Sequence, residues 1–135
     1  MVLSAEGGAL SRLTPLAKMG LGAPLGSGKQ YMPWIHIDDL CEIFVKSIED
    51  EEMKGAYNAV SPEQVTNREF TRQISKSLDK PFWLPNIPAL ALRILYGRMS
   101  VILLEGSRVS PGKIMEAGFS FQFPELEKAL KQIYT

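Results

Sequence analysis

A chain of 135 residues, 45% hydrophobic and 22% charged, has the size and composition of one globular domain. Its fifteen basic and fifteen acidic residues cancel and form no basic run, which argues against nucleic acid or an anionic membrane as a partner. The only cysteine, Cys41, excludes an intramolecular disulfide and fits a cytoplasmic protein. We expect Cys41 beside Phe44 and Val45 on the buried face of a helix, as an inert thiol, with a reactive nucleophile as the alternative.

The first elements follow from short apolar patterns. Residues 1–4 fit the end of a strand, and a short helix is expected over residues 10–18. No basic flank followed by a continuous apolar stretch opens the chain, so no signal peptide is expected. Further strands are predicted over residues 32–37 and 56–60.

A charged helix is predicted between these two strands, over residues 39–50. Asp39 fits its N-cap, and Glu42 three residues later completes an acidic variant of the capping box. The buried stripe of this helix is expected to consist of Leu40, Ile43, Phe44 and Ile48.

The following part of the chain is expected to be mainly helical. Thr66-Asn67-Arg68-Glu69 is a capping box that opens a helix, and a short strand is expected over residues 82–84. Residues 88–104 are very apolar, but Arg93 and Arg98 interrupt them before a membrane-spanning length is reached. This segment therefore predicts a buried or dimer-facing helix.

The C-terminal segment combines helix signals with alternating aromatic residues. Ser110-Pro111 is expected to start a short helix that Gly118 ends, and Pro124 to open a last amphipathic helix. Between them stand three alternating core residues, Phe119, Phe121 and Phe123. The alternation of strands and helices along the whole chain predicts an α/β fold.

The candidate functional site lies in a glycine-rich loop and the strand that follows it. Gly26 and Gly28 permit a tight turn, and Trp34 and His36 share one face of the strand. We expect a substrate-binding site formed by Gly26, Gly28, Lys29, Gln30, Trp34 and His36. Packing in the core is the alternative for Trp34 and His36, and an ordinary mobile surface loop is the alternative for the glycines.

Two glycine patterns in this loop fall short of nucleotide-binding motifs. A P-loop needs glycine where Ala23 stands and a hydroxyl residue where Gln30 stands. The stretch Gly20–Gly26 contains Pro24 and one residue too many for a dinucleotide fingerprint. The sequence also holds no Tyr-x-x-x-Lys and no Cys/His cluster. We therefore assign no catalytic, cofactor-binding or metal-ligating residue, and expect the chain alone to bind no cofactor.

Ordered landmarks run through nearly the whole chain. They are Leu3-Ser4, Glu6–Leu10, Leu21-Gly22, Pro24–Gln30, Trp34–Asp39, Gly55–Asn58, Ser61–Glu63, Thr66-Asn67, Arg108–Pro111, Lys113 and Ala117–Phe119. In this order they resemble the C-terminal half of extended short-chain dehydrogenase/reductases. The most similar group is the NAD-dependent epimerase/dehydratase or nucleoside-diphosphate-sugar epimerase family.

The resemblance implies a fold and a cofactor. The fold would be the substrate-side C-terminal part of that family, with few short strands packed against about five helices. It would form one domain over residues 1–135, with 1–60 as the tail of the Rossmann-linked region and 61–135 as a C-terminal helical module. In the family a Rossmann domain with the glycine fingerprint and a Tyr/Lys catalytic pair precedes this part. The resemblance thus implies NAD(P) for the full-length protein, and a truncated product or excised domain here.

One position departs from the family pattern. Nucleotide-sugar epimerases often carry an Arg-Asp pair just before the aromatic-Ile-His segment, where the arginine binds the substrate diphosphate. Met32 and Pro33 occupy these positions here, so the bidentate phosphate contact is lost. The sequence therefore leaves the substrate, and the choice between NAD and NADP, open.

Two functions stay open. The first is the substrate-binding portion of an NAD(P)-dependent nucleoside-diphosphate-sugar epimerase/dehydratase-like protein, inactive alone, with a sugar or alcohol as the small-molecule substrate. The second is a non-catalytic binding or assembly module that pairs with a separate chain. The partners implied are the missing Rossmann domain and, through an uncovered surface, a second copy of the chain.

Overall fold

The computed structural model describes the backbone of residues 1–135 and every side chain except that of Met99. In chain order the elements are β1 (Val2–Ser4), α1 (Gly8–Lys18), β2 (Tyr31–Met32), β3 (Ile35–His36), α2 (Ile37–Glu49), β4 (Val65–Thr66), α3 (Asn67–Ser77), α4 (Ala89–Tyr96), the 3-10 helix η1 (Gly97–Met99), α5 (Ser100–Leu104), α6 (Gly112–Glu116) and α7 (Leu126–Tyr134). This confirms a mixed α/β fold with few short strands, and the described backbone holds seven α-helices where about five were expected.

The strands form two separate two-stranded sheets. Strands β1 and β3 are parallel, whereas β2 and β4 are antiparallel with Tyr31 opposite Thr66. The single strand predicted over residues 32–37 is thus divided at Pro33, which has no amide hydrogen to donate to a ladder. As a result the two halves of this segment pair with different partners.

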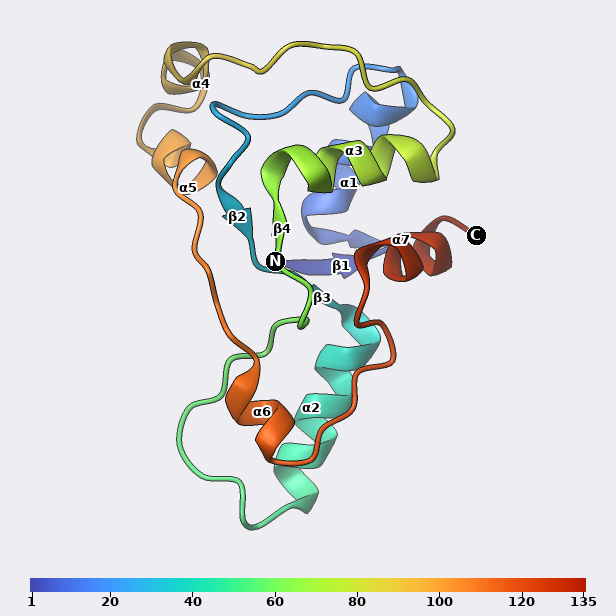
Figure 1. Ribbon diagram of the computed structural model, residues 1–135, viewed down its shortest axis with the longest axis vertical. Coiled ribbons are helices and arrows are strands. Elements are labelled where there is room, and N and C mark those ends of the chain that lie inside the picture. Colours follow the sequence, from blue (N-terminus) through green and yellow to red (C-terminus); the bar gives the residue numbers. More distant parts are fainter.

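Two apolar clusters lie on opposite sides of the parallel pair. The first is formed by β1, α1, α3 and α7 and includes Leu3, Trp34 and Phe70, while the second joins Ile35 to α2 and α6 through Ile43. In Figure 1 the first group of helices lies above the strands, and α2 with α6 lies below them. Trp34 and Ile35 enter different clusters, as expected for neighbouring residues of an extended segment.

Helix α2 begins earlier than expected and has a different cap. His36 is the N-cap, and its Nδ1 accepts a hydrogen bond from the backbone N–H of Asp38 at 3.2 Å. The prediction that Asp39 caps the helix is wrong, since this residue lies inside α2 as its third residue and is fully buried. Its carboxylate accepts hydrogen bonds from the backbone N–H groups of Gln122 (2.7 Å) and Phe123 (3.0 Å). Asp39 therefore fastens the C-terminal segment to α2.

The predicted buried stripe of α2 is also partly wrong. Ile43 is buried, but Phe44 and Ile48 are 61% and 82% exposed. Cys41, predicted to be buried beside Phe44 and Val45, is exposed as well. The sequence pattern identified the helix but assigned several of its apolar residues to the wrong face.

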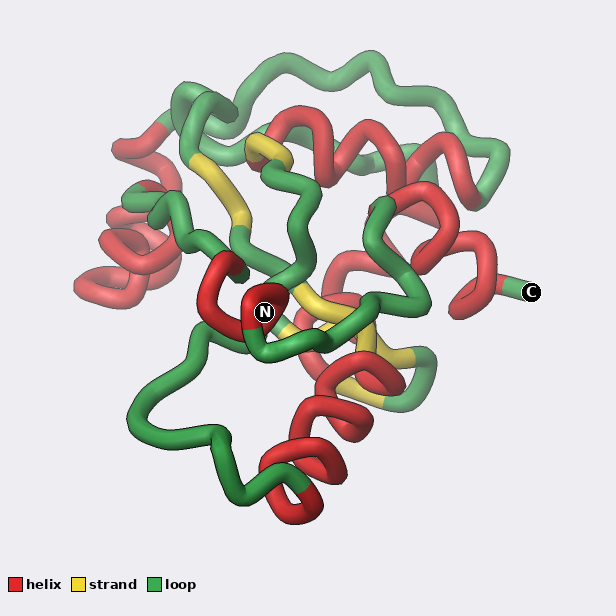
Figure 2. The backbone as a smooth tube through the Cα atoms, turned by 60° about the horizontal axis from the view of Figure 1, so that its bottom comes forward, coloured by secondary structure: helices red, strands yellow, loops and turns green.

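Three other elements predicted from the sequence also differ from the structure. The strands expected over residues 56–60 and 82–84 do not form in the described backbone. The helix expected over residues 88–104 is broken at Gly97 (φ 56°) into α4, η1 and α5, and much of its apolar surface is exposed. Figure 2 shows that long loops connect many of the helices and strands of the molecule. Among the described residues, no helix has the length and apolar character needed to cross a membrane.

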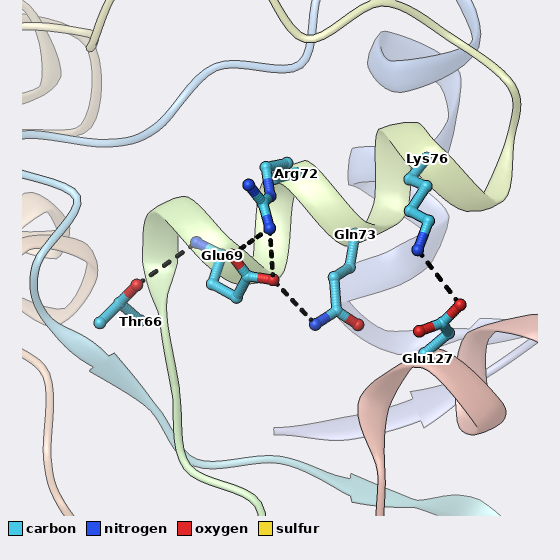
Figure 3. A network of polar contacts seen from close by, with 6 residues as sticks. All are labelled: Thr66, Glu69, Arg72, Gln73, Lys76 and Glu127. Carbon is cyan, nitrogen blue, oxygen red and sulfur yellow. Dashed lines mark hydrogen bonds and ion pairs between the residues drawn. The ribbon is translucent and has the colours of Figure 1, made fainter.

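The local signals that flank α3 are confirmed. Thr66 caps the helix, as predicted, and its hydroxyl accepts from the Glu69 backbone N–H at 3.3 Å. Figure 3 shows Glu69 accepting in turn from Arg72 and Gln73. An ion pair of 3.2 Å between Lys76 and Glu127 joins α3 to α7. Three further helices also begin near the expected positions, namely those over residues 8–18, 112–116 and 126–134.

Candidate functional site

The glycine loop that precedes β2 is anchored on both sides. The Gly26 N–H donates to the Ile87 carbonyl, and the Ile87 N–H donates to the Pro24 carbonyl, both at 2.8 Å. On the other side the Gly28 carbonyl accepts from the Arg68 N–H at 3.0 Å. These bonds hold the loop against α3 and the segment before α4.

Both candidate glycines have backbone angles that favour glycine. The φ angles are 59° at Gly26 and 69° at Gly28. A Cβ atom at Gly26 would lie 2.5 Å from Leu104 Cδ2, and one at Gly28 would lie 3.1 Å from Pro24 Cβ. The turn geometry and the close approach of α5 therefore both require glycine here.

The two polar side chains of the loop have different environments. Gln30 Nε2 donates to the carbonyls of Leu25 (2.9 Å) and Leu103 (3.0 Å), so this amide fastens the loop to α5. Its buried Oε1 has no hydrogen-bond partner among the described atoms. Lys29 is exposed, and only its backbone N–H is engaged, with the Ser27 hydroxyl at 3.2 Å. Of the two, Lys29 is the side chain that can reach a ligand in solution.

Trp34 and His36 are buried in the protein interior. Each is 1% exposed. The Trp34 indole N–H donates to the Glu63 carbonyl at 3.1 Å, and the His36 ring lies 4.1 Å from that of Phe123. Because His36 Nδ1 accepts from the Asp38 N–H, its proton belongs on Nε2, which lies 2.9 Å from Gln132 Oε1. This geometry favours the packing alternative for both residues.

Arg108 lies next to the loop, against Tyr31, and was not among the predicted site residues although it belongs to one of the family motifs. Its guanidinium carbon is 5.1 Å from the centre of the Tyr31 ring, and its Nε donates to Gln64 Oε1 at 2.5 Å. A small cleft beside it is lined by Met32 and Pro33, the positions where the family often has Arg-Asp. Among the described side chains no carboxylate pairs with Arg108, so its outer N–H groups can bind an anion.

A separate groove of about 480 Å³ lies between α1 and α7. The Tyr134 hydroxyl there lies 2.8 Å from the Thr14 hydroxyl. Burial raises the pKa of Tyr134, and the Thr14 hydrogen bond opposes this shift only in part. The described residues contain no cluster of three or more potential metal ligands here or elsewhere.

The fold, the anchored glycine loop and the ordered sequence motifs together indicate the class of protein to which the chain is similar. In sequence and structure the chain is similar to the C-terminal part of extended short-chain dehydrogenase/reductases of the epimerase type, which confirms the resemblance. Residues 87–133 match the family described as "Domain of unknown function (DUF1731)". That match covers α4 through most of α7.

Particular relatives make the likeness specific. The mouse epimerase family protein SDR39U1 is 38% identical over 134 residues, which are 98% of this chain and 45% of the relative. The crystal structure of human SDR39U1 (isoform 2) with NADPH is 37% identical, with a TM-score of 0.93 over 98% of this chain and 45% of that one. A nucleoside-diphosphate sugar epimerase from Corynebacterium glutamicum shares the fold, with a TM-score of 0.75 at 24% identity over 98% of this chain and 24% of that one. The chain spans less than half the length of these relatives.

Proposed function

We propose that the chain is the substrate-side, C-terminal portion of an NAD(P)-dependent nucleoside-diphosphate-sugar epimerase/dehydratase-like protein, and that it has no catalytic activity alone. The observation that carries the proposal is the likeness to human SDR39U1, whose structure contains NADPH. The same proposal includes a cytoplasmic location and the division of the chain into residues 1–60 and 61–135. Both rest on the resemblance and on cysteine usage.

The site residues take distinct roles in this proposal. Gly26 and Gly28 form a rigid wall, and Lys29 together with Arg108 supplies positive charge for an anionic part of the substrate. Gln30 fixes the loop to α5. Trp34 and His36, which are buried, act as positioning residues.

The cofactor would be held by groups outside this chain. The glycine stretch 20–26 follows helix α1 and leads into strand β2. A dinucleotide pyrophosphate is instead seated on a turn that follows a strand and opens a helix. The described residues therefore do not fit a dinucleotide, and we expect calorimetry of the chain with NADH or NADPH to show no binding in the low micromolar range. Binding in that range would contradict this part of the proposal.

The substrate-side role is tested by an NMR titration of the ¹⁵N-labelled chain with UDP and, separately, with glucose. We expect UDP to shift the resonances of Lys29, Tyr31 and Arg108, and Arg108→Ala to abolish these shifts. Arg93→Ala is the matched control, because Arg93 is an exposed arginine on α4. Shifts confined to other regions, or equal shifts in both variants, would argue against this site.

The assembly module remains the second candidate function. The observation in its favour is the exposed apolar surface of α2, which includes Phe44 and Ile48. Pairing with a separate chain would cover this surface. Both candidates therefore require a partner unit, and they differ in whether the completed assembly performs chemistry.

A further inference from the structure

The groove of about 480 Å³ between α1 and α7 plays no part in the proposed function. The end of β1, one face of α1 and the last turn of α7 line this α1–α7 groove, which shares no residue with the glycine loop. A ligand of the groove would therefore be bound separately from a ligand of the loop. Five polar side chains face it: Ser4, Ser11, Thr14, Lys18 and Tyr134.

The hydroxyl groups of the groove have hydrogens to offer to a ligand. The Ser4 hydroxyl accepts from the Glu6 N–H at 3.3 Å, and its own hydrogen has no acceptor among the described atoms. The Thr14 and Tyr134 hydroxyls, 2.8 Å apart, share one hydrogen bond, so the pair retains one hydrogen. Burial raises the pKa of Tyr134, so its phenol remains a neutral donor near pH ~7. The groove thus presents two hydroxyl donors.

Acceptors lie on α1, next to these donors. The Ser11 hydroxyl donates to the Gly8 carbonyl at 2.8 Å and keeps its lone pairs for a further donor. Pro15 stands inside α1 and has no N–H, so the Ser11 carbonyl lacks the donor that an uninterrupted helix would supply. A hydroxyl group of a ligand can donate to either oxygen of Ser11.

Lys18 gives the groove its positive charge. It follows Ser11 by seven residues on the same face of α1, about 10 Å further along the helix. Lys18 is exposed, and none of the ion pairs between described side chains includes it. The described lining also contains no carboxylate. The Lys18 end of the groove therefore favours a small anion.

We propose that the α1–α7 groove binds a small hydroxycarboxylic acid. Its carboxylate pairs with Lys18, and its hydroxyl groups exchange hydrogen bonds with the hydroxyl side chains of the groove. Its carbon skeleton packs against Leu10 and Ile133. A neutral polyol would leave Lys18 without an anion, and an acid without hydroxyl groups would leave the other donors and acceptors unused. The inference goes beyond the proposed function and does not depend on it.

Three compounds with the same six-membered carbon ring separate the two kinds of contact. Quinate carries a carboxylate and hydroxyl groups, cyclohexanecarboxylate carries only the carboxylate, and myo-inositol carries only hydroxyl groups. In NMR titrations of the ¹⁵N-labelled chain we expect quinate to shift the amide resonances of Ser4, Ser11, Lys18 and Tyr134. Quinate should bind at least about tenfold more tightly than either of the other compounds.

Two substitutions test the two ends of the groove. Lys18→Gln should weaken quinate binding about tenfold and leave the affinity for myo-inositol unchanged, because only the charge pair is lost. Ser4→Ala should weaken quinate binding about threefold to tenfold and leave the affinity for cyclohexanecarboxylate unchanged. Lys80→Gln is the matched control, because Lys80 is an exposed lysine that does not line the groove.

Replacing Pro15 distinguishes a binding role from a structural one. An alanine at this position supplies the N–H that the Ser11 carbonyl lacks, and it has a higher helix propensity than proline. Pro15→Ala should therefore maintain or raise the melting temperature while it weakens quinate binding. Weaker binding accompanied by a lower melting temperature would indicate general damage to α1 and count against the proposal.

Other results would overturn the proposal directly. These are the absence of shifts with quinate, shifts confined to Lys29, Tyr31 and Arg108, equal affinities for the three compounds, or equal effects of Lys18→Gln and Lys80→Gln. Shifts confined to the first set would assign the anion to the glycine loop instead. Saturating quinate should leave the shifts caused by UDP unchanged. Quinate binding without any UDP shifts would refute the proposed function and leave the α1–α7 site intact.

Discussion

Replacing Asp39 by asparagine should destabilise the protein strongly, although the two side chains have nearly the same shape. The Asp39 carboxylate is fully buried and accepts two backbone hydrogen bonds, from Gln122 and Phe123. An asparagine has one oxygen and one NH₂ group, so one backbone N–H would face another donor. Asp38→Asn is the matched control, since the Asp38 side chain is 53% exposed.

The expected magnitude follows from the two bonds. One hydrogen bond to a charged group is lost, and a buried donor is left without a partner, which together cost about 2–4 kcal/mol of unfolding free energy. For a chain of this size the melting temperature should fall by roughly 6–15 °C. Asp38→Asn should change the free energy of unfolding by no more than about 1 kcal/mol, mainly through the helix dipole.

Urea unfolding followed by circular dichroism measures the free energies, and amide hydrogen exchange locates the effect. In Asp39→Asn the amides of Gln122 and Phe123 should exchange faster than in the parent chain, while the amides of α3 keep their order of protection. Equal free energies for Asp39→Asn and Asp38→Asn, with no faster exchange at residues 122 and 123, would refute the reasoning.

Three further predictions concern the core, the glycine loop and pH. Trp34→Ala should lower the free energy of unfolding by about 3–5 kcal/mol in urea melts, because Trp34 is buried in the main cluster; an unchanged melt would show that this residue is not packed. Gly28→Ala should lower the free energy of unfolding by about 1–3 kcal/mol, through φ strain and contact with Pro24 and Arg68. Gly97→Ala should lower it less, because only the φ strain applies there. Equal losses in the two variants would show that the loop shifts to accommodate the added methyl group. Burial raises the pKa of Tyr134 in the folded state, so above pH ~10 the unfolded chain loses its proton first and stability should fall with rising pH. Tyr134→Phe should flatten this dependence, and an identical slope in both proteins would contradict it.

Local patterns predicted the elements whose signals lie within a few residues. The Thr66 cap of α3 and the apolar spacing of α7 depend on neighbouring residues, and both are confirmed. The strand predicted over residues 56–60 does not form, and the carbonyl of its first residue, Ala56, accepts from a distant side chain instead. Lys113 Nζ donates to the Lys54 and Ala56 carbonyls, and no strand ladder forms there in the described backbone. A sequence pattern contains no information on such partners.

The faces of α2 and the position of Arg108 show a second limit. Apolar periodicity identifies a helix, but it cannot tell which apolar residues meet the rest of the chain and which remain available to another surface. Arg108 reaches Tyr31 because the chain passes extremely close to β2 at Gly106, where a Cβ would meet the Tyr31 backbone. A glycine two residues before an arginine is too common a pattern to have predicted this approach. The candidate loop itself was predictable, since its glycines mark the turn directly.

The two apolar clusters limit where the protein can be divided, because each is built from distant parts of the chain. The family match begins at Ile87, but Leu126 and Leu130 of α7 are buried in one cluster with Leu3 and Phe70, which precede that point. Ile114 of α6 is likewise buried with Ile35 and Ile43. A sequence boundary at residue 87 is therefore not a folding boundary, and recombination there would join two incomplete cores. Exchanges of this C-terminal segment between relatives must preserve the surfaces that residues 1–86 present to it.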